Sequence, residues 1–167
     1  MTVESIPFNL AEIRCETRIN ASPERVWDTL TGDASSWWHA AYYTNPLGPE
    51  KGGYHIEPKL GGRMFEDWGD GQGLIWAQVI GVERNKFLQL LGDSTAEWGG
   101  PSRNCMTIKL EEDEDATILR FHCSFFGRVS EATAKSLDTG WLFLFDECLK
   151  RYVETGSLEG VPEVPAC

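Results

Sequence analysis

No window of the 167-residue sequence approaches the roughly 20 consecutive apolar residues that a membrane span requires. The first ten residues carry neither a basic segment nor an apolar core, so we expect no signal peptide. Basic residues are also few, because 15 Lys and Arg stand against 26 Asp and Glu, for a formal net charge of −11. Nucleic acids and anionic membrane surfaces both bind to basic patches. The sequence therefore predicts no nucleic-acid partner and no membrane partner.

The five cysteines include no C-x-x-C pair, and none of them has a histidine at metal-binding spacing. Scattered cysteines in odd number are typical of reduced thiols, not of a disulfide framework or a zinc site. Neither H-E-x-x-H nor a glycine-rich phosphate loop is present. We therefore predict a cytoplasmic protein without a metal and without another cofactor.

The segments that are present begin with a strand and a helix. Apolar and polar side chains alternate over residues 9–20, which predicts a half-buried strand. Ser22 is a favoured N-cap residue, and Pro23 suits the first helical position, so a helix is expected to begin there and to end at Gly32. A second short helical segment is predicted at 34–38.

A long Gly- and Pro-rich loop is expected at 39–53, and short strands separated by turns follow it. We place these strands at 54–58, 63–68, 74–82, 87–91, around 104–110, and 117–126. A loop is expected at 92–101, and an acidic hairpin tip at 111–115.

The last part of the chain changes its periodicity. From residue 129 to about 154, apolar side chains recur at spacings of three, four and five, which predicts one long amphipathic helix. An antiparallel sheet must cover one face, and only this helix is large enough to do so. We predict an α+β fold in which a curved antiparallel sheet wraps around the long C-terminal helix, with one or two short helices after the first strand. The absence of repeats and linkers favours a single domain over 1–167, with a core at about 9–156 and an irregular tail at 157–167.

Four stretches resemble the SRPBCC superfamily, whose fold is called START-like or helix-grip. They are INASPERVW at 19–27, EPKLGGRMFE at 57–66, the strand pair at 73–90, and the Gly140-Trp141 pair of the last helix. Within that superfamily the sequence is most similar to homologues of the activator of the ninety-kilodalton heat-shock protein ATPase. The resemblance implies a cavity between the sheet and the C-terminal helix that suits an apolar small molecule. It implies no shared set of catalytic residues.

Aromatic residues are the main candidates for the walls of such a cavity. The sequence has seven Trp, and large rigid rings with a polar edge are well suited to small-molecule pockets. The aromatic candidates are Trp37, Trp38, Tyr42, Tyr43, Trp68, Trp76, Trp98, Phe121, Trp141 and Phe145. Core packing is the alternative for each of them, and it is the one we favour for Trp27. The aromatic segment 37–43 is alternatively a lid or a homodimer contact.

The polar candidates are fewer. His39 and His55 flank the 39–53 loop, where either one can act as a general base if it reaches a substrate. The alternative, which we favour, is a loop histidine that is hydrogen-bonded to backbone or water. The polar residues that interrupt otherwise apolar strands, and are the main candidates to point inward, are Glu57, Glu66, Gln78 and Gln89. A glutamate that faces the cavity either pairs with an Arg such as Arg63 or awaits a ligand, and for Glu57 and Glu66 we favour an outward position on the sheet. His122 is expected on the solvent side of its strand.

Three functions fit this sequence. The first is binding of a hydrophobic small molecule between the sheet and the C-terminal helix. The second is an enzyme of the cyclase or hydrolase type that uses a pocket His, Glu or Tyr, although no catalytic residue is assigned. The third is an interaction module that regulates a chaperone ATPase, as the resemblance implies.

Overall fold

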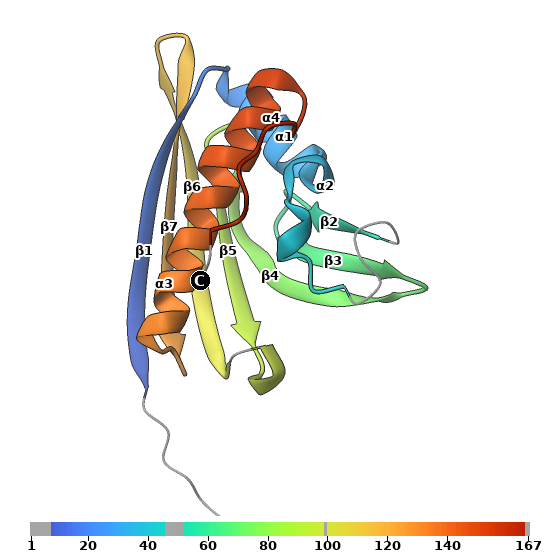
Figure 1. Cartoon of the computed structure of the whole chain (residues 1–167), viewed down its shortest axis with the longest axis vertical. Coiled ribbons are helices and arrows are strands. Elements are labelled where there is room, and N and C mark those ends of the chain that lie inside the picture. The colour runs from blue at the N-terminus through green and yellow to red at the C-terminus, as the bar shows by residue number, and fades with distance from the viewer. Residues whose placement is uncertain (1–7, 46–51, 99, 166–167) are drawn as a thin grey trace, which may run out of the picture.

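The computed structural model of the protein describes residues 8–45, 52–98 and 100–165, apart from the side chain of Trp98 (Figure 1). Its strands form one seven-stranded antiparallel sheet. They are β1 (Asn9–Ile19), β2 (Gly53–Ile56), β3 (Arg63–Gly69), β4 (Gln72–Glu83), β5 (Phe87–Ser94), β6 (Ser102–Asp113) and β7 (Ala116–Gly127). The strand order is β1-β7-β6-β5-β4-β3-β2, so the first strand pairs with the last and the others follow the chain.

The helices fall into two groups. The first group follows β1 and consists of α1 (Pro23–Gly32), α2 (Ala34–Trp37) and the 3₁₀ turn η1 (Ala40–Tyr42); a further 3₁₀ turn, η3 (Ala96–Trp98), follows β5. The second group is α3 (Glu131–Leu142), the π-helical segment η4 (Phe143–Leu149) and α4 (Lys150–Thr155). These three segments form one continuous helix, here called the C-terminal helix, because the backbone is right-handed helical at both junctions. No helix in the described part of the chain is long and apolar enough to cross a membrane.

The predicted helix boundaries have identifiable causes. Ser22 Oγ accepts a hydrogen bond from the backbone N–H of Arg25, and Pro23 occupies the first turn of α1. Gly156 ends the C-terminal helix with φ of 76°, a left-handed conformation that costs glycine little. The wide π-helical turn at Phe143–Leu149 accommodates the apolar spacing of five in this segment.

The sheet divides into two halves that are covered by different elements (Figure 1). The C-terminal helix runs along β1, β7 and β6, and both α3 and α4 contact β1. The half formed by β2, β3 and the far end of β4 bends away from it, and α1 and α2 contact β2. The helix-facing side of the sheet carries the buried core, which includes Ile13, Leu119, Phe121 and Phe145. The predicted α+β class, with a long helix across a curved antiparallel sheet, is confirmed.

Two predicted boundaries are wrong. The loop expected at 92–101 is shorter, because β5 continues to Ser94 and an ion pair between Arg103 and Asp93 joins it to β6. The acidic tip expected at 111–115 is also shorter, because β6 continues to Asp113. Its acidic side chains are tolerated there because arginines on other strands of the sheet pair with them. Arg120 on the neighbouring β7 pairs with Glu111, and Arg18 on β1 reaches across β7 to Asp113 at 3.0 Å. Residues 46–51 of the predicted 39–53 loop lie outside the described residues.

Candidate ligand cavity

A cavity of about 330 Å³ lies between the helix-facing side of the sheet and the C-terminal helix. Strands β2 to β7 form its floor, the C-terminal helix covers it, and the segment around η1 closes one side. The described residues that line it are Trp38, Tyr42, Tyr54, Met64, Trp76, Ser94, Asn104, Met106, Cys123, Phe125, Thr133, Ser136, Leu137, Gly140, Trp141 and Leu144. None of these side chains is charged, so the cavity offers mainly apolar and aromatic surface.

Stacked aromatic rings form the most rigid wall of the cavity. The ring of Trp38 lies parallel to that of Tyr54, with centroids 3.7 Å apart and an interplanar angle of 10°. Trp141 meets Trp38 edge-on at 5.9 Å, and Phe121 packs behind Trp141 at 4.7 Å. Each ring holds its neighbour in place, so this wall is formed before any ligand arrives.

A glycine of the C-terminal helix sets the position of Tyr42. A Cβ atom at Gly140 would lie 3.2 Å from Cε1 of Tyr42, which is a tight contact. Gly140 therefore lets the Tyr42 ring lie directly against the helix, next to Trp141. This accounts for the Gly140-Trp141 pair noted in the sequence.

The predicted aromatic candidates occupy several different places. Those that line the cavity are Trp38, Tyr42, Trp76 and Trp141. Those that belong to the core behind it are Trp37, Phe121 and Phe145, and Trp27 is also in the core, as predicted. Trp37 and Trp38 are buried, so the dimer contact proposed for the segment 37–43 cannot use their rings. The side chain of Trp98 lies outside the described residues.

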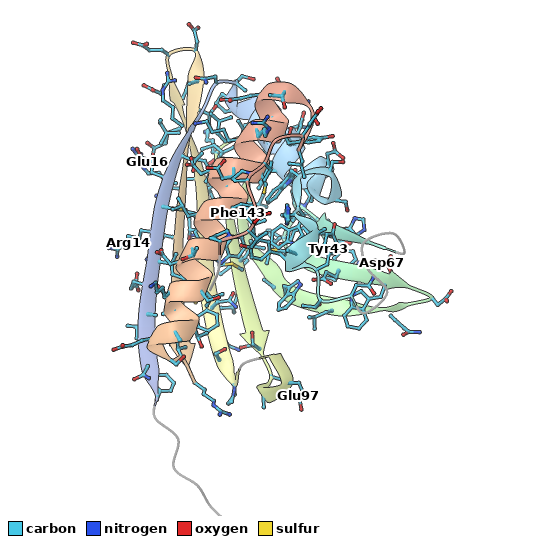
Figure 2. The ribbon with its side chains drawn as sticks, viewed as in Figure 1. Arg14, Glu16, Tyr43, Asp67, Glu97 and Phe143 are labelled. Carbon is cyan, nitrogen blue, oxygen red and sulfur yellow. The ribbon has the colours of Figure 1, made fainter. Side chains whose placement is uncertain are left out.

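Tyr43 lies beside the cavity wall without lining the cavity. Figure 2 shows it, together with Phe143, between the C-terminal helix and the bent half of the sheet. Its hydroxyl is hydrogen-bonded to the Ser35 side chain and to the backbone of Tyr54. Burial raises the pKa of Tyr43 above its usual value, although these hydrogen bonds oppose the shift. Tyr43 thus holds β2 against the segment after α1.

Glu66 is buried, not outward-facing as favoured from the sequence, and its partners do not include the Arg63 that was considered for a buried carboxylate. Its side chain is 1% exposed, and its carboxylate accepts hydrogen bonds from the backbone N–H groups of Thr44 and Asn45 at 3.0 Å. The indole N–H groups of Trp68 and Trp76 donate to it at 3.1 Å, and the Thr44 hydroxyl donates at 2.9 Å. Within the described residues no Arg or Lys pairs with it. Neutral donors alone therefore hold a buried carboxylate, and they fasten the 44–45 segment and Trp76 to β3.

The other predicted acid–base residues do not line the cavity. Glu57 pairs with Arg63 at 2.8 Å on the surface, and Arg63 lowers the pKa of Glu57 to about 2. His55 is exposed on β2 and lies against Phe65, with centroids 5.1 Å apart. His39 caps η1, where its Nδ1 accepts a hydrogen bond from the Ala41 N–H at 3.2 Å.

The inward orientation expected for Gln78 and Gln89 is wrong. Both are exposed on the outer face of the sheet, because their strand neighbours Ala77, Val79, Leu88 and Leu90 are the residues that point into the core. Ile80 on β4 is also exposed, so apolar residues occur on both faces of that strand. This mixed pattern made the glutamines look like interruptions of a buried strand. His122 lies on the outer face, as predicted, and contacts Glu12.

Sequence reasoning missed five polar residues that line the cavity, Tyr54, Ser94, Asn104, Thr133 and Ser136. Of these, Tyr54 and Asn104 are buried. Asn104 shares the buried face of β6 with Met106, and this alternation was a usable signal. Tyr54 follows a glycine pair next to the long loop, where no periodicity marks a buried position. Burial raises the pKa of Tyr54 well above its usual value, and the nearby Glu66 carboxylate adds to the shift. Burial also raises the pKa of the Cys123 thiol to about 12, so both groups keep their protons at neutral pH.

A wider depression of about 590 Å³ lies elsewhere, along β1, β7, β6 and β5. Most of its lining side chains are charged or polar and belong to the outer face of the sheet. Figure 2 shows Arg14 and Glu16 projecting from β1 away from the C-terminal helix. Several of its charges are already paired across strands, as Arg120 is with Glu16 and Glu111. We therefore take the aromatic cavity as the candidate site. Across the described ranges, no group of three or more His, Cys, Asp or Glu residues is arranged to hold a metal ion.

Several solved structures share this fold. DynU16, a putative protein in the dynemicin biosynthetic locus, is 23% identical with a TM-score of 0.65, and the match covers 88% of this chain and 48% of that protein. This chain thus spans about half the length of DynU16. The Aha1 dimer from Colwellia psychrerythraea is 22% identical with a TM-score of 0.60, over 87% of this chain and 97% of its own. CalU16 from Micromonospora echinospora is 15% identical with a TM-score of 0.56, over 90% and 88% of the two chains.

At these identities the structures show a common fold and nothing more specific. No functionally curated protein matches the sequence significantly. The model of one family, described as activator of Hsp90 ATPase homolog 1-like protein, matches residues 20–154. That match spans α1, the whole sheet after β1 and almost all of the C-terminal helix. The chain therefore belongs to the activator of Hsp90 ATPase homolog 1-like family, whose fold is the helix-grip fold of the SRPBCC superfamily.

Proposed function

We propose that this protein binds an apolar small molecule in the cavity between the sheet and the C-terminal helix. The observation that carries the proposal is the lining itself, which is mainly aromatic and aliphatic and contains no charged side chain among its described residues. The volume of about 330 Å³ is at the lower end of the roughly 300–1,000 Å³ that small-molecule pockets span. A ligand of two or three fused rings suits a cavity of this size.

The stacked rings support binding in a second way. Because Trp38, Tyr54 and Trp141 are held by one another, a ligand does not have to order them when it binds. Preorganisation of this kind increases affinity by lowering the entropy cost of association. Transfer of an apolar ring from water into the cavity then contributes about 25 cal/mol for each Å² that is buried.

The lining favours binding over acid–base catalysis. A cyclase or hydrolase needs a group that exchanges protons near neutral pH within reach of its substrate. No His, Asp or Glu occurs among the described lining residues. Tyr54 and Cys123 do line the cavity, but the pKa of each is raised by burial. An enzymatic role would have to use a group outside this lining.

Three further points concern the protein's possible partners and its location in the cell. Regulation of a chaperone ATPase is named by the family's description, and no described feature of this chain points to a chaperone surface. The Colwellia relative was solved as a dimer, so a homodimer is proposed here too, through a surface other than the buried Trp37 and Trp38 rings. A cytoplasmic setting remains the expectation from the unpaired cysteines.

The test is an NMR titration with naphthalene, a two-ring hydrocarbon without any polar group. The variant Ser136→Trp places a large ring at the half-buried rim of the cavity, on α3. We expect naphthalene to shift the resonances of cavity residues in the wild type, and the variant to bind it at least tenfold more weakly. The matched control is Lys135→Trp, because Lys135 is the exposed neighbour on the same helix and should leave binding unchanged.

Equal affinity of the Ser136→Trp variant and the wild type would place the ligand elsewhere and refute the proposal. Native mass spectrometry of freshly purified protein complements the titration. A mass excess that disappears on denaturation would give the mass of the natural ligand.

A further inference from the structure

We infer that the cavity selects a neutral, mostly apolar ligand that carries hydroxyl groups, which Tyr54 and Asn104 recognise. The inference rests on the proposed function and specifies the chemical class of the ligand. It combines two observations: buried polar atoms that lack partners, and an uncharged lining with a carboxylate behind it.

The first observation is that two buried polar atoms of the cavity have no hydrogen-bond partner. Tyr54 is 1% exposed and Asn104 is 9% exposed, and both line the cavity. Within the described part of the chain, the hydroxyl of Tyr54 and Oδ1 of Asn104 have no hydrogen-bond partner. Folded proteins rarely leave buried polar atoms unpaired, because each such atom loses its bonds to water without replacement. A ligand that supplies the partners accounts for these two buried polar residues in a mainly apolar cavity.

The chemistry of the two atoms defines what the ligand must offer. The raised pKa of Tyr54 keeps its hydroxyl protonated, so it can donate a hydrogen bond to a ligand oxygen. Oδ1 of Asn104 is an acceptor and requires a donor such as a hydroxyl group. A ligand hydroxyl can meet either requirement, because it both donates and accepts.

The two groups sit on different parts of the floor. Tyr54 lies on β2 and Asn104 on β6, and β3, β4 and β5 separate these strands in the sheet. Adjacent strands are about 4.8 Å apart, so the two side chains approach the cavity from separate directions. Two polar groups on the ligand are therefore needed to satisfy both residues, and their contributions should be independent.

A glycine holds the Asn104 amide in position. A Cβ atom at Gly92 would lie 2.6 Å from Oδ1 and 2.9 Å from Nδ2 of Asn104, so the amide lies against the bare backbone of β5. A glycine inside a strand often marks such a close approach. The amide is thus packed from behind, which fixes it within the cavity floor.

The second observation concerns charge. The described lining contains no cation that could neutralise an acidic ligand. The nearest buried charge is the Glu66 carboxylate, which binds the indole N–H of Trp76 while the rest of Trp76 lines the cavity. Burial raises the pKa of Tyr54, and the negative charge of Glu66 nearby adds to the shift. An anionic ligand would lose its hydration without compensation and would meet a like charge, so the site excludes it.

The experiment compares four probes with one naphthalene core: naphthalene, 2,6-dihydroxynaphthalene, 2,6-naphthalenedicarboxylate and a trimethylammonium-substituted naphthalene. We expect the diol to bind on the order of tenfold more tightly than naphthalene, since its hydroxyl groups offer partners for hydrogen bonds that naphthalene leaves unmade. The dicarboxylate should bind more weakly than naphthalene. The cationic probe tests the alternative that the aromatic rings and Glu66 together attract a cation, and it should not exceed the diol.

Two variants assign the effect to residues. Tyr54→Phe and Asn104→Leu should each remove several-fold of the advantage of the diol, measured within each variant as the ratio of diol affinity to naphthalene affinity. Their effects should add in the double variant, because the two groups act separately. The matched control is Tyr43→Phe, which removes the hydroxyl of a half-buried tyrosine that already has neighbours within the protein and does not line the cavity. It should leave the preference for the diol intact.

The outcomes separate this inference from the proposed function. If naphthalene binds and the diol gains nothing, or if the two variants leave the gain unchanged, the inference is wrong while apolar binding stands. If the dicarboxylate or the cation binds more tightly than the diol, the assignment to neutral ligands is wrong. If no probe binds in the cavity, the proposed function fails as well.

Discussion

Two groups of buried polar atoms in this region differ in how fully they are hydrogen-bonded. The first is the Glu66 carboxylate, which accepts hydrogen bonds from Thr44, Asn45 and two indoles, including that of Trp76. The second comprises Tyr54 and Asn104, which line the cavity with polar atoms that lack partners among the described residues. The first group is complete without a ligand, and the second is not.

This difference separates a structural role from a binding role better than residue type does. A glutamate near a pocket suggests catalysis. The hydrogen bonds of Glu66, however, attach the 44–45 segment to β3, which is a structural role. Tyrosine and asparagine side chains usually form hydrogen bonds with water at the surface. Tyr54 and Asn104 instead place polar atoms without partners in an apolar cavity. The comparison predicts that removing a polar group from the Glu66 cluster lowers the stability of the protein, whereas removing one from the cavity lining does not.

The largest effect is expected at Glu66. Glu66→Ala would leave several buried N–H and O–H donors without an acceptor, so we expect it to lower the free energy of unfolding by about 3–5 kcal/mol. Urea denaturation followed by circular dichroism measures the change. Glu66→Gln keeps one acceptor oxygen and should lower the free energy of unfolding by less than Glu66→Ala does. A loss below about 1 kcal/mol for Glu66→Ala would mean that the cluster is not structural, and the comparison would fail.

The opposite sign is expected on the cavity side. Tyr54→Phe removes a buried hydroxyl that has no partner, so the unliganded protein should keep its stability or gain up to about 1 kcal/mol. Tyr43→Phe removes a hydroxyl that is bonded to Ser35 and to the Tyr54 backbone, and should cost about 1 kcal/mol. Thermal and urea unfolding of both variants measures the two changes in the free energy of unfolding. Equal losses in both would show that the Tyr54 hydroxyl has a partner within the protein.

Much of the fold followed from periodicity alone. The alternation in residues 9–20 predicted β1, and the switch to helical spacing after residue 129 predicted the C-terminal helix. Both signals depend only on which side chains are apolar, and one buried face is enough to impose them. The Ser22-Pro23 cap was equally local, because its hydrogen bond joins residues three positions apart.

The candidate site was less predictable, since its contacts join distant segments. The donors to Glu66 include Thr44, which lies 22 positions away, and no local pattern encodes that contact. The outward orientation of Gln78 was hidden because Ile80, on the same face of β4, is also exposed. The unmade bonds of Tyr54 and Asn104 are a property of the packed cavity, so only the structure reveals them. Sequence therefore identified the kinds of residue in the cavity wall, and three-dimensional packing decided which of them line the cavity.

The smallest effect is expected at the surface pair of Glu57 and Arg63, which provides a reference for both buried regions. Arg63 lowers the pKa of Glu57 from its ordinary 4.5 to about 2. Because the folded-state pKa lies below the unfolded one, the pair stabilises the protein fully above about pH 4.5 and loses this contribution as the pH falls toward 2. The stability difference between wild type and Glu57→Gln, from urea denaturation at pH 7, 4 and 3, should therefore be small at neutral pH and shrink on acidification. High salt should reduce it further, because both side chains are exposed to solvent. A difference that grows at low pH would mean that Glu57 takes up its proton more readily in the folded protein, which would contradict the ion pair.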